Sequence, residues 1–253
     1  MGSIGVGTTI DKGVIADSRL SRITRVLFNE EIIEFPTVKS TIASLTNIPV
    51  EVRFTSSLPL GYGFGISAAS ALSTAWSINK LLSLKISKLE LAKICHIAEV
   101  KNKTGLGSVA TQITGGFLIK DLPGIPGKAK RLPFVGKKIY ATIIGKLDTP
   151  TMLADRKKLK MIDAASDLAL KKVKNIKPLS LTKIIDISYQ FAASSLLLTD
   201  TRVVSQINQI RKNGGHATVA IFGQVVLSDI KPKLDTKYRI EELMITSNIV
   251  SLI

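Results

Sequence analysis

The chain has 253 residues, of which 45% are apolar and 5% aromatic, and its formal net charge is +16. This length allows one large or two modest domains with real cores, and a single cysteine, Cys95, excludes a disulfide framework. No apolar run approaches the roughly 18 residues that would indicate a membrane span. The N-terminus lacks the basic and apolar regions of a signal peptide. Together these features predict a soluble cytoplasmic protein with no membrane association.

Lysines are crowded between residues 120 and 183 and account for much of the positive charge. Such a balance is compatible with nucleic-acid binding. However, no nucleic-acid motif and no interleaved aromatic residues accompany the lysines, and they fall on the polar faces of helical patterns. A basic field also suits anionic small molecules such as ATP and carboxylates. We therefore expect a small-molecule substrate and no nucleic-acid partner, and the sequence leaves a homodimer open.

Alternating and helical hydrophobic patterns predict the first elements of the chain. The expected strands are residues 13–16, 23–28 and 50–54, with a hairpin turn at 29–31 and a short helix at 37–45.

Residues 59–71 form a glycine-rich segment between the strand at 50–54 and an Ala- and Leu-rich helix expected at 71–82. Glycines at every second position, Gly61, Gly63 and Gly65, leave room for a group that approaches the backbone closely. The following helix start offers free N–H groups and a positive dipole end, which together favour phosphate. Ser67 adds a hydroxyl that can reach phosphate or a metal ion.

Two other interpretations of this segment remain open. A tight turn before a core helix would use the glycines for packing alone. The spacing Gly63-x-Gly65-x-x-Ala68 loosely fits a dinucleotide fingerprint, which requires an acidic residue at the end of a second strand. The residue near that distance, Glu90, lies inside a helical pattern instead, and this disfavours the dinucleotide interpretation.

A helix is expected at residues 87–102, where Ser87 and Glu90 form a capping-box pattern. His96 and Glu99 are three positions apart and therefore share a face of this helix. For the rest of the first half, we expect a loop from residue 104, a short helix, a glycine pair at 115–116, a strand, and a rigid turn at 123–127.

In the second half, strands and helices are segregated rather than alternating, which favours an α+β fold. The expected strands are residues 138–144, 217–222 and 225–227, and the expected helices are 156–175, 180–198 and 201–213, with a glycine C-cap at 214–215.

The segment P-L-G-Y-G-F-G-I-S-A-A at residues 59–69 resembles the phosphate loop of the GHMP kinases, P-x-G-x-G-L-G-S-S-A-A, with Phe64 and Ile66 as departures. Further segments are similar, in order, to motifs of archaeal pantoate kinases. They are G-S-I-G-V-G at 2–7, C-H-I-A-E-V at 95–100, T-G-L-G-S-V at 104–109 followed by a glutamine, G-G and a basic residue, and P-G-I-P-G at 123–127. The similarity is strong over residues 2–127 and weaker beyond. In the second half, only Gly223 echoes the third glycine motif of these kinases.

This resemblance implies an α+β GHMP kinase fold with two domains. Residues 1–135 would form an N-terminal ATP-binding domain of the ribosomal-protein-S5-domain-2 type, and residues 136–253 a C-terminal ferredoxin-like α/β sandwich. The implied reaction is transfer of a phosphoryl group from ATP, with Mg²⁺, to the C4 hydroxyl of pantoate, giving 4-phosphopantoate for coenzyme A biosynthesis.

The resemblance also implies roles for individual residues. Catalysis would involve Ser67, Glu99 and Ser108, and Ser67 and Glu99 would also hold Mg²⁺. Pantoate would contact Ser3, His96 and Lys120, the last standing where most relatives have arginine. The nucleotide would be held by Pro59, Gly61, Gly63, Phe64, Gly65, Ile66, Ser67, Ala68 and Ala69.

Two departures from the family pattern bear on activity. The family has a further segment with a first strand before G-S-x-G, so we expect that this strand is missing here or that the true start lies upstream. Ser108 replaces the usual aspartate, and we expect it to orient the substrate hydroxyl without taking its proton. The alternatives are another GHMP small-molecule kinase, of the homoserine or mevalonate type, and a non-catalytic ligand-binding relative.

Overall fold

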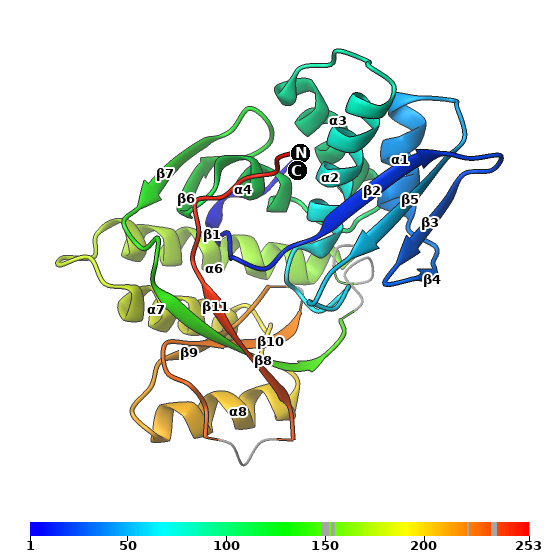
Figure 1. The fold of residues 1–253 in the computed structure, drawn as a ribbon. Helices are drawn as coiled ribbons and strands as arrows, with labels where there is room; N and C mark the ends of the chain where they lie inside the picture. Colours follow the sequence, from blue (N-terminus) through cyan, green and yellow to red (C-terminus); the bar gives the residue numbers. More distant parts are fainter. Residues whose placement is uncertain (148–151, 153–154, 222, 234–236, 253) are drawn as a thin grey trace. The chain divides into compact units, whose positions relative to one another are not determined.

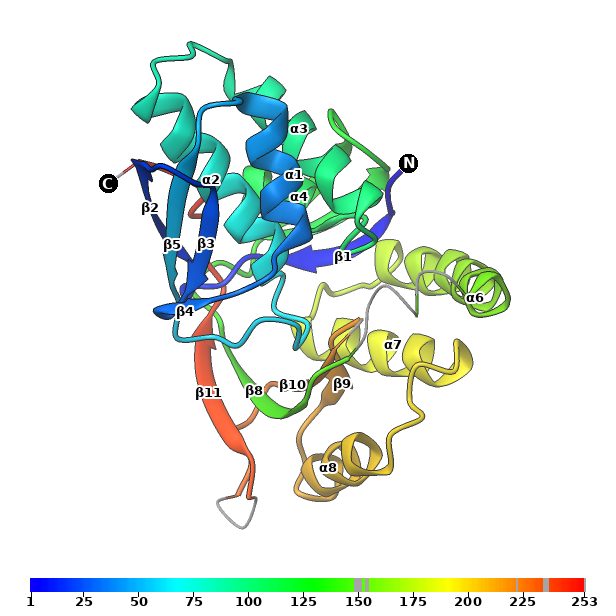
Figure 2. The same cartoon turned by 90° about the vertical axis from the view of Figure 1, so that its right-hand side faces the viewer.

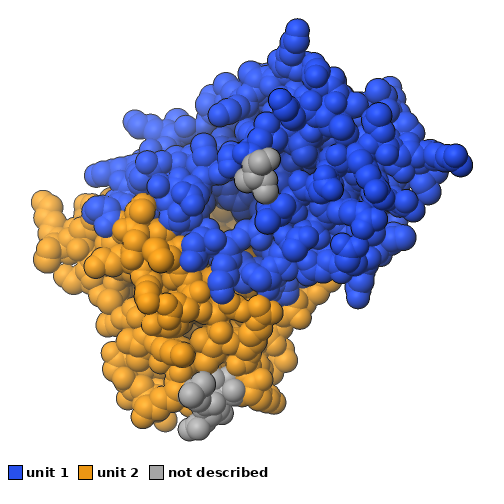
Figure 3. Space-filling model, in the orientation of Figure 1, with its two compact units in different colours: residues 1–60, 65–133, 246–253 blue, residues 61–64, 134–245 orange. Residues whose placement is uncertain are grey.

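The computed structural model describes residues 1–147, 152, 155–221, 223–233 and 237–252 (Figure 1). These residues form two compact units, coloured separately in Figure 3. Unit 1 comprises residues 1–60, 65–133 and 246–253, and unit 2 comprises residues 61–64 and 134–245. The division into domains after residue 135 stays a prediction. The units themselves change over after residue 133, and residues 246–253 pack in unit 1.

The described strands of unit 1 form two sheets. The first has the order β2-β5-β3-β4 and consists of β2 (Ile15–Leu20), β5 (Val50–Thr55), β3 (Arg25–Phe28) and β4 (Glu31–Ile32). The second has the order β1-β6-β7 and consists of β1 (Gly5–Thr8), β6 (Phe117–Leu122) and β7 (Lys128–Leu132). The pairs within each sheet are antiparallel except β3 and β5, which run parallel.

Four helices are described in unit 1, and three of them carry predicted site residues. They are α1 (Pro36–Leu45), α2 (Ile66–Leu81), α3 (Lys88–Lys101) and α4 (Ser108–Thr114). As Figures 1 and 2 show, α1 and α2 cover one face of the first sheet. There, Val50, Val52 and Phe54 of β5 pack with Ile42 and Ile78 in a common core. A second core joins α2, α3 and α4 through small and aliphatic side chains, among them Ala71, Leu91 and Val109.

Local sequence explains how two of these helices begin. The Ser87 hydroxyl accepts a hydrogen bond from the backbone N–H of Glu90 at 3.3 Å, so the predicted cap of α3 is confirmed. The predicted start of α2 at residue 71 is wrong. The helix begins at Ile66, because Gly65 adopts the left-handed conformation that can precede a first helical turn at once.

Unit 2 consists of one antiparallel sheet and the helices packed with it. The sheet has the order β11-β8-β10-β9, formed by β8 (Lys138–Gly145), β9 (Ala217–Val219), β10 (Gln224–Ser228) and β11 (Arg239–Met244). The helices are α6 (Arg156–Lys174), α7 (Leu181–Ser194) and α8 (Thr201–Lys212). Val203 and Ile207 of α8 pack with Val219 and Val226 in the core.

The segregated strands and helices confirm the predicted α+β class. The predicted strand at 217–222 is shorter, since β9 ends at Val219, and residue 222 lies outside the described part of the chain. Among the described helices, none is both long and apolar enough to cross a membrane.

Candidate functional site

The glycine-rich loop depends on the conformational freedom of its glycines. Gly61, Gly63 and Gly65 have φ angles of +87°, +99° and +72°, which L side chains rarely adopt. In unit 2, a Cβ on Gly63 would lie 2.9 Å from the Cα of Gly223, and a Cβ on Gly223 would lie 2.1 Å from the carbonyl oxygen of Tyr62. Gly223, the weak echo of a third glycine motif, therefore packs directly against the loop backbone.

The loop ends in unit 1 at the start of α2, where Gly65 is the N-cap and supplies no side-chain cap. The N–H groups of Ile66, Ser67 and Ala68 have no carbonyl four residues earlier within the helix. The side chains of Ile66 and Ala68 are buried, whereas those of Pro59, Phe64 and Ala69 are half-buried. This first turn therefore offers backbone donors and a positive dipole end to an anion.

Glu99 on α3 is a buried carboxylate, with 1% of its surface exposed. Burial raises its pKa, while the nearby hydroxyls of Ser67 and Thr104 act in the opposite direction. Thr104 Oγ1 donates to Glu99 Oε1 at 3.0 Å and lies 2.7 Å from Thr37 Oγ1. No lysine, arginine or histidine of the described chain pairs with this carboxylate.

The surroundings of Glu99 fit a divalent cation. Ser67 Oγ is buried and, although it lies near the carboxylate, makes no hydrogen bond of normal geometry. A Cβ on Gly105 would stand 2.3 Å from Glu99 Oε2, so glycine leaves room beside that oxygen. The described residues contain no cluster of three or more acidic, histidine or cysteine ligands. A hard cation held here would therefore need further oxygen ligands from substrate or water.

Lys120 on β6 is a buried ammonium, with 7% of its surface exposed. Its Nζ donates to the carbonyl oxygen of Gly107 at 2.9 Å, and burial lowers its pKa to about 8. No carboxylate of the described residues pairs with it. Both Lys120 Nζ and Ser3 Oγ lie 2.2 Å from where a Cβ on Gly107 would stand. The ammonium and the hydroxyl are therefore neighbours.

His96 on α3 is also buried, and its Nε2 lies 2.8 Å from the carbonyl oxygen of Met1. The backbone N–H of Ser3 donates to the carbonyl oxygen of Leu106 at 3.0 Å. These bonds hold the first residues of the chain against α3 and the loop before α4.

Ser108 and Gln112 lie one turn apart on α4, and both approach Gly65. A Cβ on Gly65 would stand 3.7 Å from the Cβ of Ser108 and 2.9 Å from Nε2 of Gln112. The Gln112 amide donates to the Gly65 carbonyl oxygen at 2.9 Å. The Ser108 side chain is therefore beside the start of α2.

Within unit 1, the residues predicted from sequence thus occur in four separate contacts. Ser67 lies near Glu99, and Ser3 lies beside Lys120, while Ser108 lies at Gly65 and His96 contacts Met1. Thr104, Gly107 and Gln112 had no role predicted from the sequence. All three stand in the motif that begins at residue 104, but only the fold places the Gln112 side chain on the loop.

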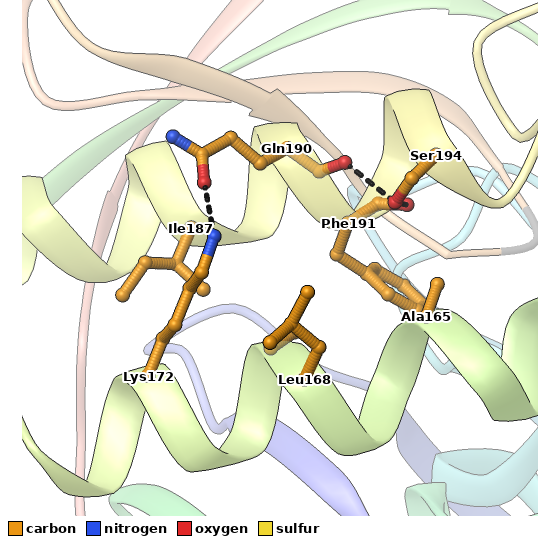
Figure 4. Close-up of a pocket in the computed structure, with 8 residues that line it drawn as sticks. Ala165, Leu168, Lys172, Ile187, Gln190, Phe191 and Ser194 are labelled. Carbon is orange, nitrogen blue, oxygen red and sulfur yellow. Dashed lines mark hydrogen bonds between the residues drawn. The ribbon is translucent and has the colours of Figure 1, made fainter.

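A separate hollow lies between α6 and α7 in unit 2 (Figure 4). Its lining includes Ala165, Leu168 and Phe191, together with Lys172, whose Nζ donates to Gln190 Oε1 at 3.1 Å. None of the residues predicted for the site lines it.

Comparison with known families covers most of the chain. The family model described as GHMP kinases N terminal domain matches residues 35–116. The pantoate kinase of Methanocaldococcus jannaschii is 30% identical over 205 residues, which are 79% of this chain and 73% of that protein. The pantoate kinase of Methanospirillum hungatei is 30% identical over 206 residues, covering 78% and 68% of the two chains.

Solved structures agree at the level of the fold. A protein described as a phosphotransferase related to the CoA biosynthesis pathway aligns with a TM-score of 0.81 at 24% identity, covering 98% of this chain and 88% of that chain. A mevalonate kinase aligns with a TM-score of 0.66 at 13% identity, covering 96% and 92%. The sequence match to the two pantoate kinases extends over most of their length. The chain therefore belongs to the pantoate kinase family of the GHMP kinases.

Proposed function

We propose that this protein is a cytoplasmic kinase that transfers a phosphoryl group from ATP to the C4 hydroxyl of pantoate, giving 4-phosphopantoate for coenzyme A biosynthesis. The observation that carries the proposal is Lys120, a buried ammonium beside the Ser3 hydroxyl and with no carboxylate partner among the described residues. A buried charge is costly unless it is paired. An acceptor with a carboxylate supplies the missing partner.

The triphosphate of ATP would bind along the glycine-rich loop. Gly61, Gly63 and Gly65 allow the phosphates to approach the backbone, and the first N–H groups of α2 would donate to them. Pro59, Phe64 and Ala69 complete the segment expected to hold the nucleotide. Phosphoryl transfer requires mainly positioning and charge neutralisation, and this loop offers both.

Glu99 and Ser67 would hold Mg²⁺ in this proposal. Two observations support this assignment. The buried Ser67 hydroxyl makes no hydrogen bond, and the nearby Glu99 carboxylate has no cationic partner among the described residues. When bound, Mg²⁺ neutralises charge on the phosphate oxygens. Thr104 orients Glu99 by donating to Oε1, which leaves Oε2 beside Gly105 for the ion.

The acceptor carboxylate would bind at Lys120 and Ser3, with His96 as a further contact. Lysine provides a point charge rather than the planar fork of arginine. A side chain at Gly107 would displace both Lys120 Nζ and Ser3 Oγ, so glycine at this position leaves the two groups side by side.

Ser108 would orient the acceptor hydroxyl. A serine hydroxyl is too weak a base to take a proton at neutral pH. However, a loose transition state for phosphoryl transfer requires little early deprotonation of the nucleophile. The proposed mechanism therefore has no general base, and the rate comes from alignment of the hydroxyl with the phosphate and from charge neutralisation.

A homoserine-type acceptor is the second candidate, because homoserine kinases share the fold at a TM-score of 0.67. Homoserine carries an ammonium as well as a carboxylate and would need an anionic partner besides the metal-binding Glu99. The side-chain groups at Gly107 are instead a hydroxyl and an ammonium with no carboxylate partner among the described residues, which favours an acceptor without an amino group.

Release of ADP should be measured with Mg-ATP and a panel of pantoate, homoserine, mevalonate and no acceptor. We expect turnover that depends on pantoate and exceeds that with the other acceptors. Preference for homoserine or mevalonate would replace the proposed acceptor. Binding of ATP without turnover on any acceptor would favour a non-catalytic ligand-binding protein.

A further inference from the structure

Gln112 makes a contact that the family resemblance does not explain. Its side-chain amide donates to the carbonyl oxygen of Gly65 at 2.9 Å, and the same oxygen accepts the backbone N–H of Ala69 at 3.1 Å. Gly65 is the residue at which the loop becomes α2. The carbonyl before the phosphate-facing turn is therefore held by one bond from inside its helix and one from another helix.

This second bond matters because Gly65 has little else to fix its orientation. Glycine explores more backbone conformations than any other residue, and Gly65 lies at φ +72° and ψ +21° without a side-chain cap. Rotation of the peptide after Gly65 would turn the N–H of Ile66 together with the carbonyl oxygen. A donor that holds the carbonyl therefore also holds the direction of the first free N–H of α2.

The helix that carries Gln112 is itself fixed at both ends. Arg131 donates from Nε to the carbonyl oxygen of Gly115 at 2.9 Å and from its guanidinium to that of Thr114. At the start of α4, Lys120 Nζ on β6 donates to the carbonyl oxygen of Gly107 at 2.9 Å. Gln112 thus extends from an anchored support.

We propose that Gln112 is a positioning residue that sets the direction of the phosphate-binding N–H groups at the start of α2 by fixing the Gly65 carbonyl. The inference rests on the proposed nucleotide site at this loop. Because Ser108 lies on the same face of α4 and also approaches Gly65, one helix then aligns the acceptor hydroxyl and the phosphate loop together.

The test is Gln112→Met, which keeps length and volume but removes the donor. Loss of one neutral hydrogen bond predicts that the ATP dissociation constant and the KM for ATP rise about three- to tenfold. The KM for pantoate should stay within about twofold, because Lys120 and Ser3 are untouched. A purely structural role would instead lower the melting temperature and leave the two KM values in their original ratio.

Gln190→Met is the matched control, since it removes from α7 an exposed acceptor of a hydrogen bond from Lys172 on α6 and should change neither KM. If Gln112→Met fails to fold, Gln112→Asn tests the same bond by withdrawing the amide by one methylene. Unchanged ATP affinity in a folded Gln112 variant would overturn the inference while leaving the proposed function intact. Absence of ATP binding in the wild type would overturn both.

Discussion

Replacement of Lys120 by methionine should separate the stability of this protein from its activity. The substitution keeps the long apolar stem of the side chain but removes a buried ammonium that has no carboxylate partner in the described chain. We expect the variant to fold at least as stably as the wild type near pH 7 and to bind the acceptor poorly. Most substitutions of a buried residue would instead lower both properties.

The magnitude follows from the shift in the Lys120 pKa, from 10.5 to about 8, which burial causes. Below pH 8, the ammonium is charged in both the folded and the unfolded states, and its burial costs roughly 3 kcal/mol. Between about pH 8 and 10.5, the unfolded state holds the proton and the folded state does not, so the free energy of unfolding of the wild type rises with pH. Methionine removes the cost of burying the ammonium, and with it the pH dependence. It also leaves the Gly107 carbonyl without its donor, which costs about 1–3 kcal/mol.

Urea unfolding at several pH values measures the free energies of unfolding of the variant and the wild type. The stability advantage of the variant over the wild type should fall by about 3 kcal/mol between pH 8 and 10.5. The KM for pantoate should rise about 10- to 100-fold at pH 7, because a charged hydrogen bond is lost, while the KM for ATP stays unchanged. In the wild type, the pantoate KM should also rise above pH 8 as the ammonium loses its proton.

Lys120→Arg is the matched control, because arginine stays charged throughout this range and should keep the pantoate KM independent of pH. A stability difference between Lys120→Met and the wild type that does not change from pH 8 to 10.5 would refute the assignment of a buried, unpaired ammonium. An unchanged pantoate KM in Lys120→Met would refute its role as the carboxylate partner.

Two other predictions concern the proposed chemistry and the first sheet. Ser108→Ala should lower kcat by less than about tenfold, since one neutral hydrogen bond is lost, whereas Glu99→Ala should lower it far more by removing a metal ligand. Equal loss in the two variants would give Ser108 a chemical role. Glu51 accepts from Arg53, Arg25 and Arg19, and these contacts lower its pKa to about 2. This carboxylate therefore stabilises the fold above the unfolded pKa near 4.5, and the contribution is lost as pH falls toward 2. Glu51→Gln should accordingly lower the melting temperature at pH 7, with a difference from the wild type that closes in acid. Glu90→Gln, which removes an exposed ion pair with Lys93, is the control. A difference in melting temperature between Glu51→Gln and the wild type that persists at pH 2 would contradict this role of Glu51.

Periodic patterns predicted those helices and strands whose apolar residues recur on one face of the element. The alternation at residues 50–54 and the Ser87 cap both correspond to observed elements. In contrast, β7 and β11 were missed, because K-A-K-R-L and R-I-E-E-L-M lack a clear apolar alternation. These segments become strands by pairing with the edges of β6 and β8.

Contacts that depend on the tertiary fold could not be predicted from residue types. The motif that includes Lys120 indicated a charged contact, but only the fold shows that its ammonium is buried without a carboxylate partner among the described residues. Gln112 lies 47 positions from Gly65, and nothing in the intervening sequence indicates that they meet. The glycine spacing predicted a phosphate loop, yet the contact of Gly223 with Tyr62 and Gly63 was visible only as one weakly matching glycine.

The position of the phosphoryl group in the product tests the central claim most directly. The protein should be incubated with Mg-ATP and pantoate, and the product examined by proton-coupled phosphorus NMR. We predict a new phosphomonoester signal split into a triplet, because the C4 hydroxyl is attached to a methylene group. A doublet would place the phosphate on the secondary C2 hydroxyl, and the absence of any phosphomonoester would contradict pantoate kinase activity.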